Sequence, residues 1–169
     1  MGCLDQEKIL TYIFLVVFII FLLLQILTYI FSDFCQLFKE PFKGNAFGEM
    51  VRQVQLIECG INPNYIINKK IYYKNEVVGV ISNNILILKG SSTLLDVFID
   101  LYLKKTKVKH GKITYGSKIM FEAIKPQLVN EKINYITGWS LGAMVGIQVS
   151  LWLFETTKVK TKNTFFGLP

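Results

Sequence analysis

The segment "INYITGWSLGAMVGIQVSLWLF", residues 133–154, decides the fold. It opens with residues typical of a strand, passes through Gly-Trp-Ser-Leu-Gly and continues as an apolar run long enough for a helix. A strand that turns directly into a helix leaves little room at the corner, so the residues two before and two after it must be small. Gly138 and Gly142 meet that need. We predict that Ser140 occupies the corner in a strained backbone conformation, with its hydroxyl exposed at the helix N-terminus.

A serine at such a corner is a candidate nucleophile for acyl transfer, a reaction that needs hydrogen-bond donors aimed at the oxyanion. The backbone N–H of Leu141 is one candidate donor. The second usually comes from the turn after an earlier central strand, and "ILILKGSST" supplies such a turn, with Gly90 for close approach and Ser91 after it. The sequence therefore predicts an oxyanion hole formed by Ser91 and Leu141. The alternatives are a glycine-rich helix start packed on a sheet and an ordinary Gly-Ser-Ser loop.

The flanking sequence predicts alternating strands and helices. Apolar residues recur at helical spacing over 47–57, and "GINPN" stops that helix. Two strands follow, joined at Asn83-Asn84, a pair that tolerates the positive φ of a tight hairpin. The remaining predicted elements are a helix over 93–102, a short basic connection over 104–112, a helix over 113–129 that Pro126 kinks or ends, the strand and helix around Ser140, and a strand over 163–166. This order predicts an α/β fold, a parallel or mixed sheet with crossover helices.

From about Val77 to Pro169 the chain resembles the fungal-type (class three) lipase family of α/β-hydrolases. Three blocks carry the resemblance in the family's order: "ILILKGSSTLLDVFIDL", "ITGWSLGAMVG" and "NTFFGLP". The resemblance implies an esterase or lipase that acts on acylglycerols or phospholipids, with Ser140 as nucleophile and Ser91 and Leu141 as oxyanion donors. Trp139, Ala143 and Lys89 stand where the family usually has His, Gly and Arg.

The family places its acid and then its histidine after the Gly-x-Pro turn, whereas here no Asp or His follows Ser140. His110 has two interpretations. It could form a triad with Asp96 or Asp100 and Ser140 in another chain order, or it could be a surface or packing histidine without a catalytic role. A last strand over 163–166 would also be an exposed, Phe-rich sheet edge. We therefore expect a C-terminally incomplete hydrolase domain that lacks acid and base, completed by a missing C-terminal segment or by another chain.

Residues 9–31 form an uncharged, apolar stretch long enough to cross the hydrocarbon layer of a bilayer. The exit "FSDFCQLFK" lacks the small residues of a signal-peptide cleavage site, so we predict one uncleaved transmembrane anchor rather than a signal peptide or a core helix. The predicted organisation is a tail over 1–8, the anchor, a connector over 32–46 and the lipase-like domain over 47–169. More basic residues follow the anchor than precede it, which favours a cytoplasmic domain.

The net charge of +7 comes mostly from lysine, in clusters over 104–112 and 158–162. These clusters are either solvated loops or a surface that attracts anionic lipid. Arginine is nearly absent, which argues against nucleic acid as a partner. Three scattered cysteines suggest neither a disulfide framework nor a metal site, and no cofactor is expected.

The functional expectation is therefore a membrane-anchored, lipase-like serine hydrolase of lipid metabolism, with a lipid or acyl ester as substrate. The alternative is a non-catalytic, membrane-tethered interaction module that keeps the hydrolase scaffold.

Overall fold

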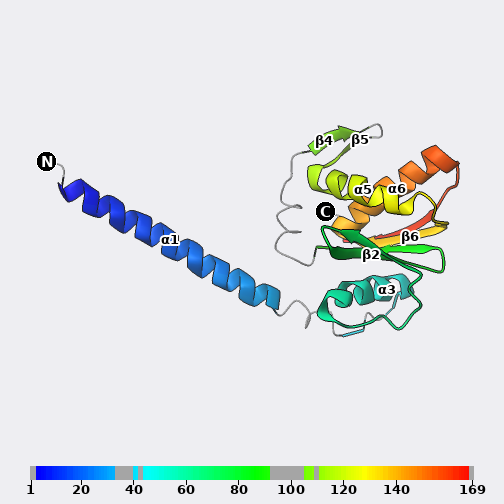
Figure 1. Cartoon of the computed structure of the whole chain (residues 1–169), viewed down its shortest axis with the longest axis horizontal. Coiled ribbons are helices and arrows are strands. Elements are labelled where there is room, and N and C mark those ends of the chain that lie inside the picture. Colours follow the sequence, from blue (N-terminus) through cyan, green and yellow to red (C-terminus); the bar gives the residue numbers. More distant parts are fainter. Residues whose placement is uncertain (1–2, 33–39, 42–43, 92–104, 109–110, 168–169) are drawn as a thin grey trace. The chain divides into compact units, whose positions relative to one another are not determined.

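The computed structural model describes residues 3–32, 40–41, 44–91, 105–108 and 111–167. The chain divides into two compact units, Met1–Gln36 and Leu37–Pro169. The first unit is the helix α1 (Cys3–Ser32), drawn in blue in Figure 1. Its segment Lys8–Ile26 has a mean hydropathy of 2.9 and is not buried. It is long and apolar enough to cross a membrane, a criterion that a signal sequence near the N-terminus also meets.

The second unit contains a five-stranded sheet in the order β1-β2-β3-β6-β7. The strands are β1 (Lys69–Tyr73), β2 (Glu76–Ser82), β3 (Ile85–Leu88), β6 (Tyr135–Trp139) and β7 (Lys162–Phe166). The first three pair antiparallel, whereas β3, β6 and β7 run parallel. The sheet is therefore mixed, and the α/β class predicted from the sequence is confirmed.

Two tight hairpins build the antiparallel half of this sheet. Asn83 and Asn84, between β2 and β3, both have positive φ, as predicted. Lys74 and Asn75 repeat this geometry between β1 and β2. The sequence does not predict β1, because only Ile71 in "KKIYY" is buried and the strand shows little apolar character.

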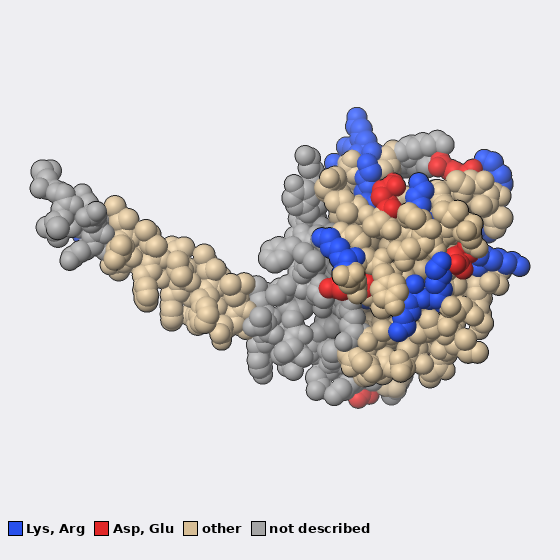
Figure 2. Space-filling view, in the orientation of Figure 1, with Lys and Arg blue, Asp and Glu red and all other residues tan. Residues whose placement is uncertain are grey.

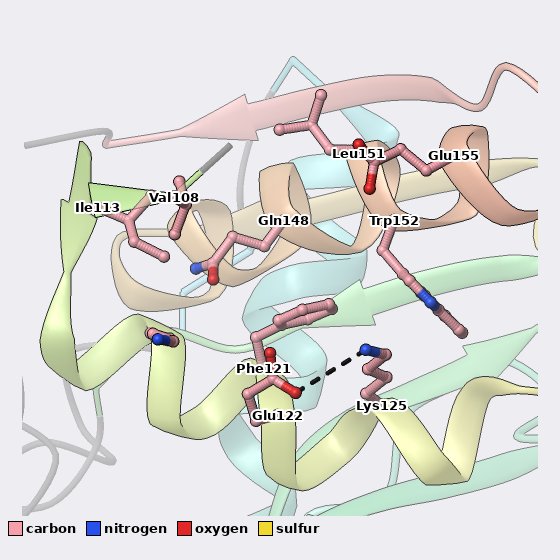
Figure 3. Close-up of a pocket in the computed structure, with 10 residues that line it drawn as sticks. Val108, Ile113, Phe121, Glu122, Lys125, Gln148, Leu151, Trp152 and Glu155 are labelled. Atoms are coloured by element: carbon pink, nitrogen blue, oxygen red, sulfur yellow. Dashed lines mark ion pairs between the residues drawn. The ribbon is translucent and has the colours of Figure 1, made fainter. Parts of the chain in front are cut away.

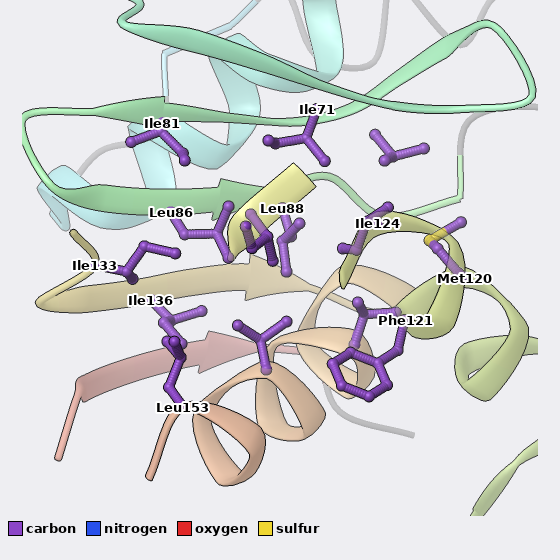
Figure 4. Close-up of a cluster of buried hydrophobic side chains, with 14 of the residues drawn as sticks. Ile71, Ile81, Leu86, Leu88, Met120, Phe121, Ile124, Ile133, Ile136 and Leu153 are labelled. Atoms are coloured by element: carbon purple, nitrogen blue, oxygen red, sulfur yellow. The ribbon is translucent and has the colours of Figure 1, made fainter. Parts of the chain in front are cut away.

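Helices cover both faces of the sheet (Figure 1). The helix α3 (Ala46–Gln55) packs on one face through Val51 and Val54, which contact Val80 and Ile87. On the other face, α5 (Tyr115–Leu128) and α6 (Leu141–Thr157) bury the larger core. Figure 4 shows this core, in which side chains of β1, β2, β3 and β6 meet side chains of both helices.

The ends of these helices follow local signals in the sequence. The Asn45 side chain accepts hydrogen bonds from two N–H groups of the first turn of α3. A short 3₁₀ helix, η1 (Leu56–Cys59), follows and ends at Gly60, which is left-handed. The helix α5 continues past Pro126 to Leu128. Because proline has no N–H, the carbonyl of exposed Glu122, one turn earlier, lacks its helical hydrogen bond. The helix ends two residues after Pro126, so the cost is small.

Two predictions about the second unit are wrong. Residues 104–112 are not a simple connection, because β4 (Lys105–Val108) and β5 (Gly111–Thr114) form a separate antiparallel sheet. Cys59 is disulfide-bonded, although the cysteine spacing suggests no disulfide. The helix predicted over 93–102 lies outside the described residues.

Candidate functional site at the β6–α6 corner

Ser140 lies between the last residue of β6 and the first residue of α6, with φ 51° and ψ −120°. A residue with a side chain rarely adopts a positive φ, and such a conformation costs about 1–3 kcal/mol. Three backbone hydrogen bonds hold it. The Ser140 N–H donates to the Phe166 carbonyl at 3.0 Å, and the Ser140 carbonyl accepts from Ala143 and Met144 at 2.9 and 3.1 Å. The strained corner predicted from the sequence is confirmed.

The two glycines that flank the corner are required by backbone contacts. A Cβ at Gly138 would lie 2.7 Å from the carbonyl carbon and oxygen of Gly142. A Cβ at Gly142 would lie 2.2 Å from the Lys89 carbonyl oxygen. Neither neighbour is a flexible side chain, so no other residue fits without moving the chain. The first turn of α6 therefore lies directly against the end of β3.

This contact brings Gly90, the residue before Ser91, to the corner at Ser140. A Cβ at Gly90 would lie 3.0 Å from the Trp139 carbonyl oxygen and 3.5 Å from the Ser140 Cβ. Ser91, partly exposed, follows directly in the chain. Leu141 is the first residue of α6, so no carbonyl of its own helix accepts its N–H. Gly90, Ser140 and Leu141 are thus neighbours, as the motif order predicts.

The Gly90 turn (Gly90–Ser91) is held by a side chain that the sequence reasoning missed. Gln55, the last residue of α3, is fully buried. Its Oε1 accepts from the Gly90 N–H at 3.1 Å, and its Nε2 donates to the carbonyls of Gly90 and Ser91 at 3.5 and 3.4 Å. A signal was present, because Gln55 shares the apolar face of α3 with Val51 and Val54 by helical spacing. A polar side chain on such a face needs buried partners.

Trp139 supports the corner from the α3 side of the sheet. A Cβ at Gly90 would lie 3.2 Å from its ring carbon Cε3, and a Cβ at Gly167 would lie 2.4 Å from its Nε1. Gly167 also has a positive φ of 56°. The indole therefore packs against the turns that follow β3 and β7. This packing accounts for a large flat residue at position 139.

The described residues include no histidine, because His110 lies outside them together with Asp96 and Asp100. Glu155 is the acid that follows Ser140 on α6. At 1.5 Å per residue it lies about 20 Å along the helix from the corner, too far for contact. No group of three or more metal-ligating side chains occurs among the described residues. The corner itself offers a hydroxyl and N–H donors at a helix N-terminus, a combination suited to an oxyanion.

A separate groove lies between α5 and α6, away from the corner (Figure 3). It has a volume of about 220 Å³, and Phe121, Leu151 and Trp152 are among the residues that line it. Lys125 lies over the rings of Phe121 and Trp152, with Nζ 5.7 and 5.8 Å from their centroids. The groove receives no residue from 138–142, so it is distinct from the candidate site.

Comparison of the chain with protein-family models, with curated proteins and with solved structures finds no match.

Proposed function

We propose that the second unit is a serine hydrolase domain of the α/β-hydrolase type, with Ser140 as its nucleophile. The Ser140 Oγ adds to the carbonyl carbon of an acyl ester, and its proton passes to a base. The Leu141 N–H and Ser91 stabilise the oxyanion, the leaving alcohol takes the proton from the base, and water then hydrolyses the acyl-serine and restores the Ser140 hydroxyl. His110, the histidine that a triad in another chain order would use, lies outside the described residues.

The observation that carries this proposal is the backbone of Ser140 together with the Gly90 turn packed against it. Folding maintains a strained residue only where the surrounding structure over-determines it, and such residues cluster at functional sites. Here three hydrogen bonds and two obligatory glycines hold Ser140, and a buried glutamine fixes the facing turn. A glycine-rich helix start packed on a sheet would need the small residues but not a positive φ at a serine.

We propose an acylglycerol or phospholipid as the substrate class. The support is the resemblance of the three sequence blocks to class three lipases and the apolar helix α1, which is long enough to tether the domain at a bilayer. The basic residues after α1 favour a cytoplasmic domain. The disulfide at Cys59 argues the other way, because such bonds persist mainly in oxidising compartments.

The alternative is a non-catalytic, membrane-tethered module on the same scaffold. The backbone contacts at Gly138 and Gly142 are compatible with it, because a helix that starts tightly against a sheet needs small residues whether or not the hydroxyl reacts. Both proposals keep the strained corner and differ in whether the Ser140 hydroxyl reacts.

The test is covalent labelling of the full chain in detergent with a fluorophosphonate, followed by peptide mass spectrometry. We expect the adduct on Ser140, lost in Ser140→Ala and kept in the matched variant Ser150→Ala. Ser150 lies on the same helix, and its hydroxyl bonds Thr161 rather than the corner. A folded chain that stays unlabelled favours the non-catalytic module, and equal labelling of Ser140→Ala refutes the assignment.

A further inference from the structure

The β4–β5 hairpin has two chemically different faces. Lys105, Lys107 and Lys112 are exposed, whereas Val108 and Ile113 are half-buried and line the groove between α5 and α6. The antiparallel register places Lys107 directly opposite Lys112, so both side chains project from the same face. The apolar face thus holds the hairpin on the domain, and the basic face is left to solvent.

Like charges placed directly opposite on paired strands are destabilising unless an anion neutralises them. The described ion pairs do not involve these three lysines. Residues 101–121 contain lysines at 104, 105, 107, 109, 112 and 118 and no acidic residue. Figure 2 shows lysine side chains projecting from the region where Figure 1 places β4 and β5. The hairpin therefore presents concentrated positive charge without an internal counter-charge among the described residues.

Exposed apolar side chains follow the hairpin at once. Tyr115 and Ile119, one turn apart at the start of α5, are 42% and 39% exposed. The N-terminus of α5 adds partial positive charge at the same place, with the Thr114 side chain as its cap. Lysines beside an exposed tyrosine and an exposed aliphatic residue make a combination typical of surfaces that bind the headgroup zone of a bilayer.

We propose that this hairpin surface (Lys105, Lys107, Lys112, Tyr115 and Ile119) docks on an anionic lipid bilayer. Charge complementarity and the exposed tyrosine and isoleucine support a lipid surface, and the same chain carries a helix of membrane-spanning length. A nucleic acid fits less well, because the chain has a single arginine, Arg52, which bonds Glu49 on α3.

The hairpin surface lies close to the β6–α6 corner in the fold. The Thr114 hydroxyl oxygen, at the end of β5, lies 3.8 Å from the Met144 Sδ, and the Met144 N–H donates to the Ser140 carbonyl. The end of β5 therefore adjoins the first turn of α6. The docking proposal does not depend on catalysis, so it stands or falls separately from the proposed hydrolase.

The experiment compares amide hydrogen exchange of the full chain in nanodiscs of neutral phosphatidylcholine and in nanodiscs with about 30 mol % phosphatidylserine. A sheet of only two strands is less stable than a larger one, so the amides of 105–108 and 111–114 should exchange faster than those of the five-stranded sheet when no lipid is bound. We expect slower exchange at 105–114 on the anionic nanodiscs. About 1 M salt, with a Debye length of about 3 Å, should remove the protection.

The decisive variant is Lys105→Glu/Lys107→Glu/Lys112→Glu, which should lower the docked population by about a hundredfold and abolish the protection. The matched variant Lys158→Glu/Lys160→Glu/Lys162→Glu changes the net charge by the same amount, on exposed residues at the opposite end of α6. This variant should keep the protection of the hairpin amides. If the first variant does not fold, the loss of protection with added salt, measured on the unmodified chain, tests the proposal instead.

Equal exchange on neutral and anionic nanodiscs, or protection that survives in the hairpin variant, would overturn the proposal. Equal protection by a single-stranded oligonucleotide at the same phosphate concentration would overturn the assignment to lipid.

Discussion

Gln55 connects α3 to the Gly90 turn through both ends of its side-chain amide, and Gly90 in turn lies against Ser140. The hydrogen bonds run from a fully buried side chain to backbone groups, so few other residues could replace it. A buried N–H that loses its partner costs about 1–3 kcal/mol. Without Gln55, the Gly90 turn would have to move to find another hydrogen-bond partner for its N–H. Residue 55 therefore controls the position of a proposed oxyanion donor without itself touching a substrate.

We predict that Gln55→Leu slows fluorophosphonate labelling of Ser140 by more than tenfold, because the Gly90 turn loses its fixed position. The matched control is Gln53→Leu on the same helix. Gln53 is also buried, but its amide bonds Asn64 N–H and Glu49, away from the corner. Chemical denaturation should show that both variants lose similar stability, while labelling slows only in Gln55→Leu. Parallel losses of labelling in the two variants would mean a general structural effect.

At the scale of elements, α3 depends on the loop that follows it as well as on the sheet. The Tyr65 hydroxyl donates to the Met50 carbonyl at 3.0 Å, which fastens the loop after Gly60 to the middle of α3. Burial, with a smaller contribution from the Glu49 carboxylate, raises the pKa of Tyr65 above its ordinary value. The folded state thus keeps the phenol neutral at a pH where the unfolded chain begins to ionise it.

The pH dependence of unfolding should show this difference. A pKa raised by folding leaves the stability unchanged below the unfolded pKa of about 10 and lowers it as the pH rises from there toward the folded pKa. We predict that Tyr65→Phe is less stable than the unmodified protein near neutral pH, because the bond to Met50 is lost, and that the gap narrows above about pH 10. Urea unfolding of both proteins at pH 7 to 11 measures the gap. A constant gap would contradict the raised pKa.

At the scale of the whole molecule, the chain combines a helix of membrane-spanning length with a basic α/β unit. The small excess of basic residues after α1 and the disulfide at Cys59 favour opposite sides of the membrane for that unit. The side matters for the docking surface, because the cytoplasmic leaflet is the more anionic. Topology is therefore the property of the whole chain that most affects both proposals.

Lys132→Thr gives Asn130 the Asn-x-Thr acceptor pattern at an exposed turn before β6, so it reports topology with little structural change. After translation with endoplasmic reticulum membranes, we expect no glycan, because a cytoplasmic domain never meets the transferase. Asn130→Gln in the same background is the negative control. A glycan removed by an N-glycosidase would place the domain in the lumen and support the oxidised state of Cys59.

The corner at Ser140 and its two glycines were predictable because they follow from a local rule. A strand that enters a helix directly forces small residues at fixed offsets, whatever the rest of the chain does. The Asn83-Asn84 turn and the Asn45 end of α3 also depend on neighbours within a few residues. The position of Gly90 beside Ser140 could be inferred only through the order of motifs and the family resemblance.

What the sequence determined by itself is the α/β class, the apolar N-terminal helix, the strained serine corner and the basic clusters, because each arises from spacing, composition or local backbone sterics. Only the tertiary structure showed the antiparallel strand β1, the two-faced β4–β5 hairpin, the Gln55 bonds and the Trp139 packing. Each of these depends on a partner distant in sequence. Packing against that partner, rather than local propensity, decides which residues are buried and which polar groups are bonded.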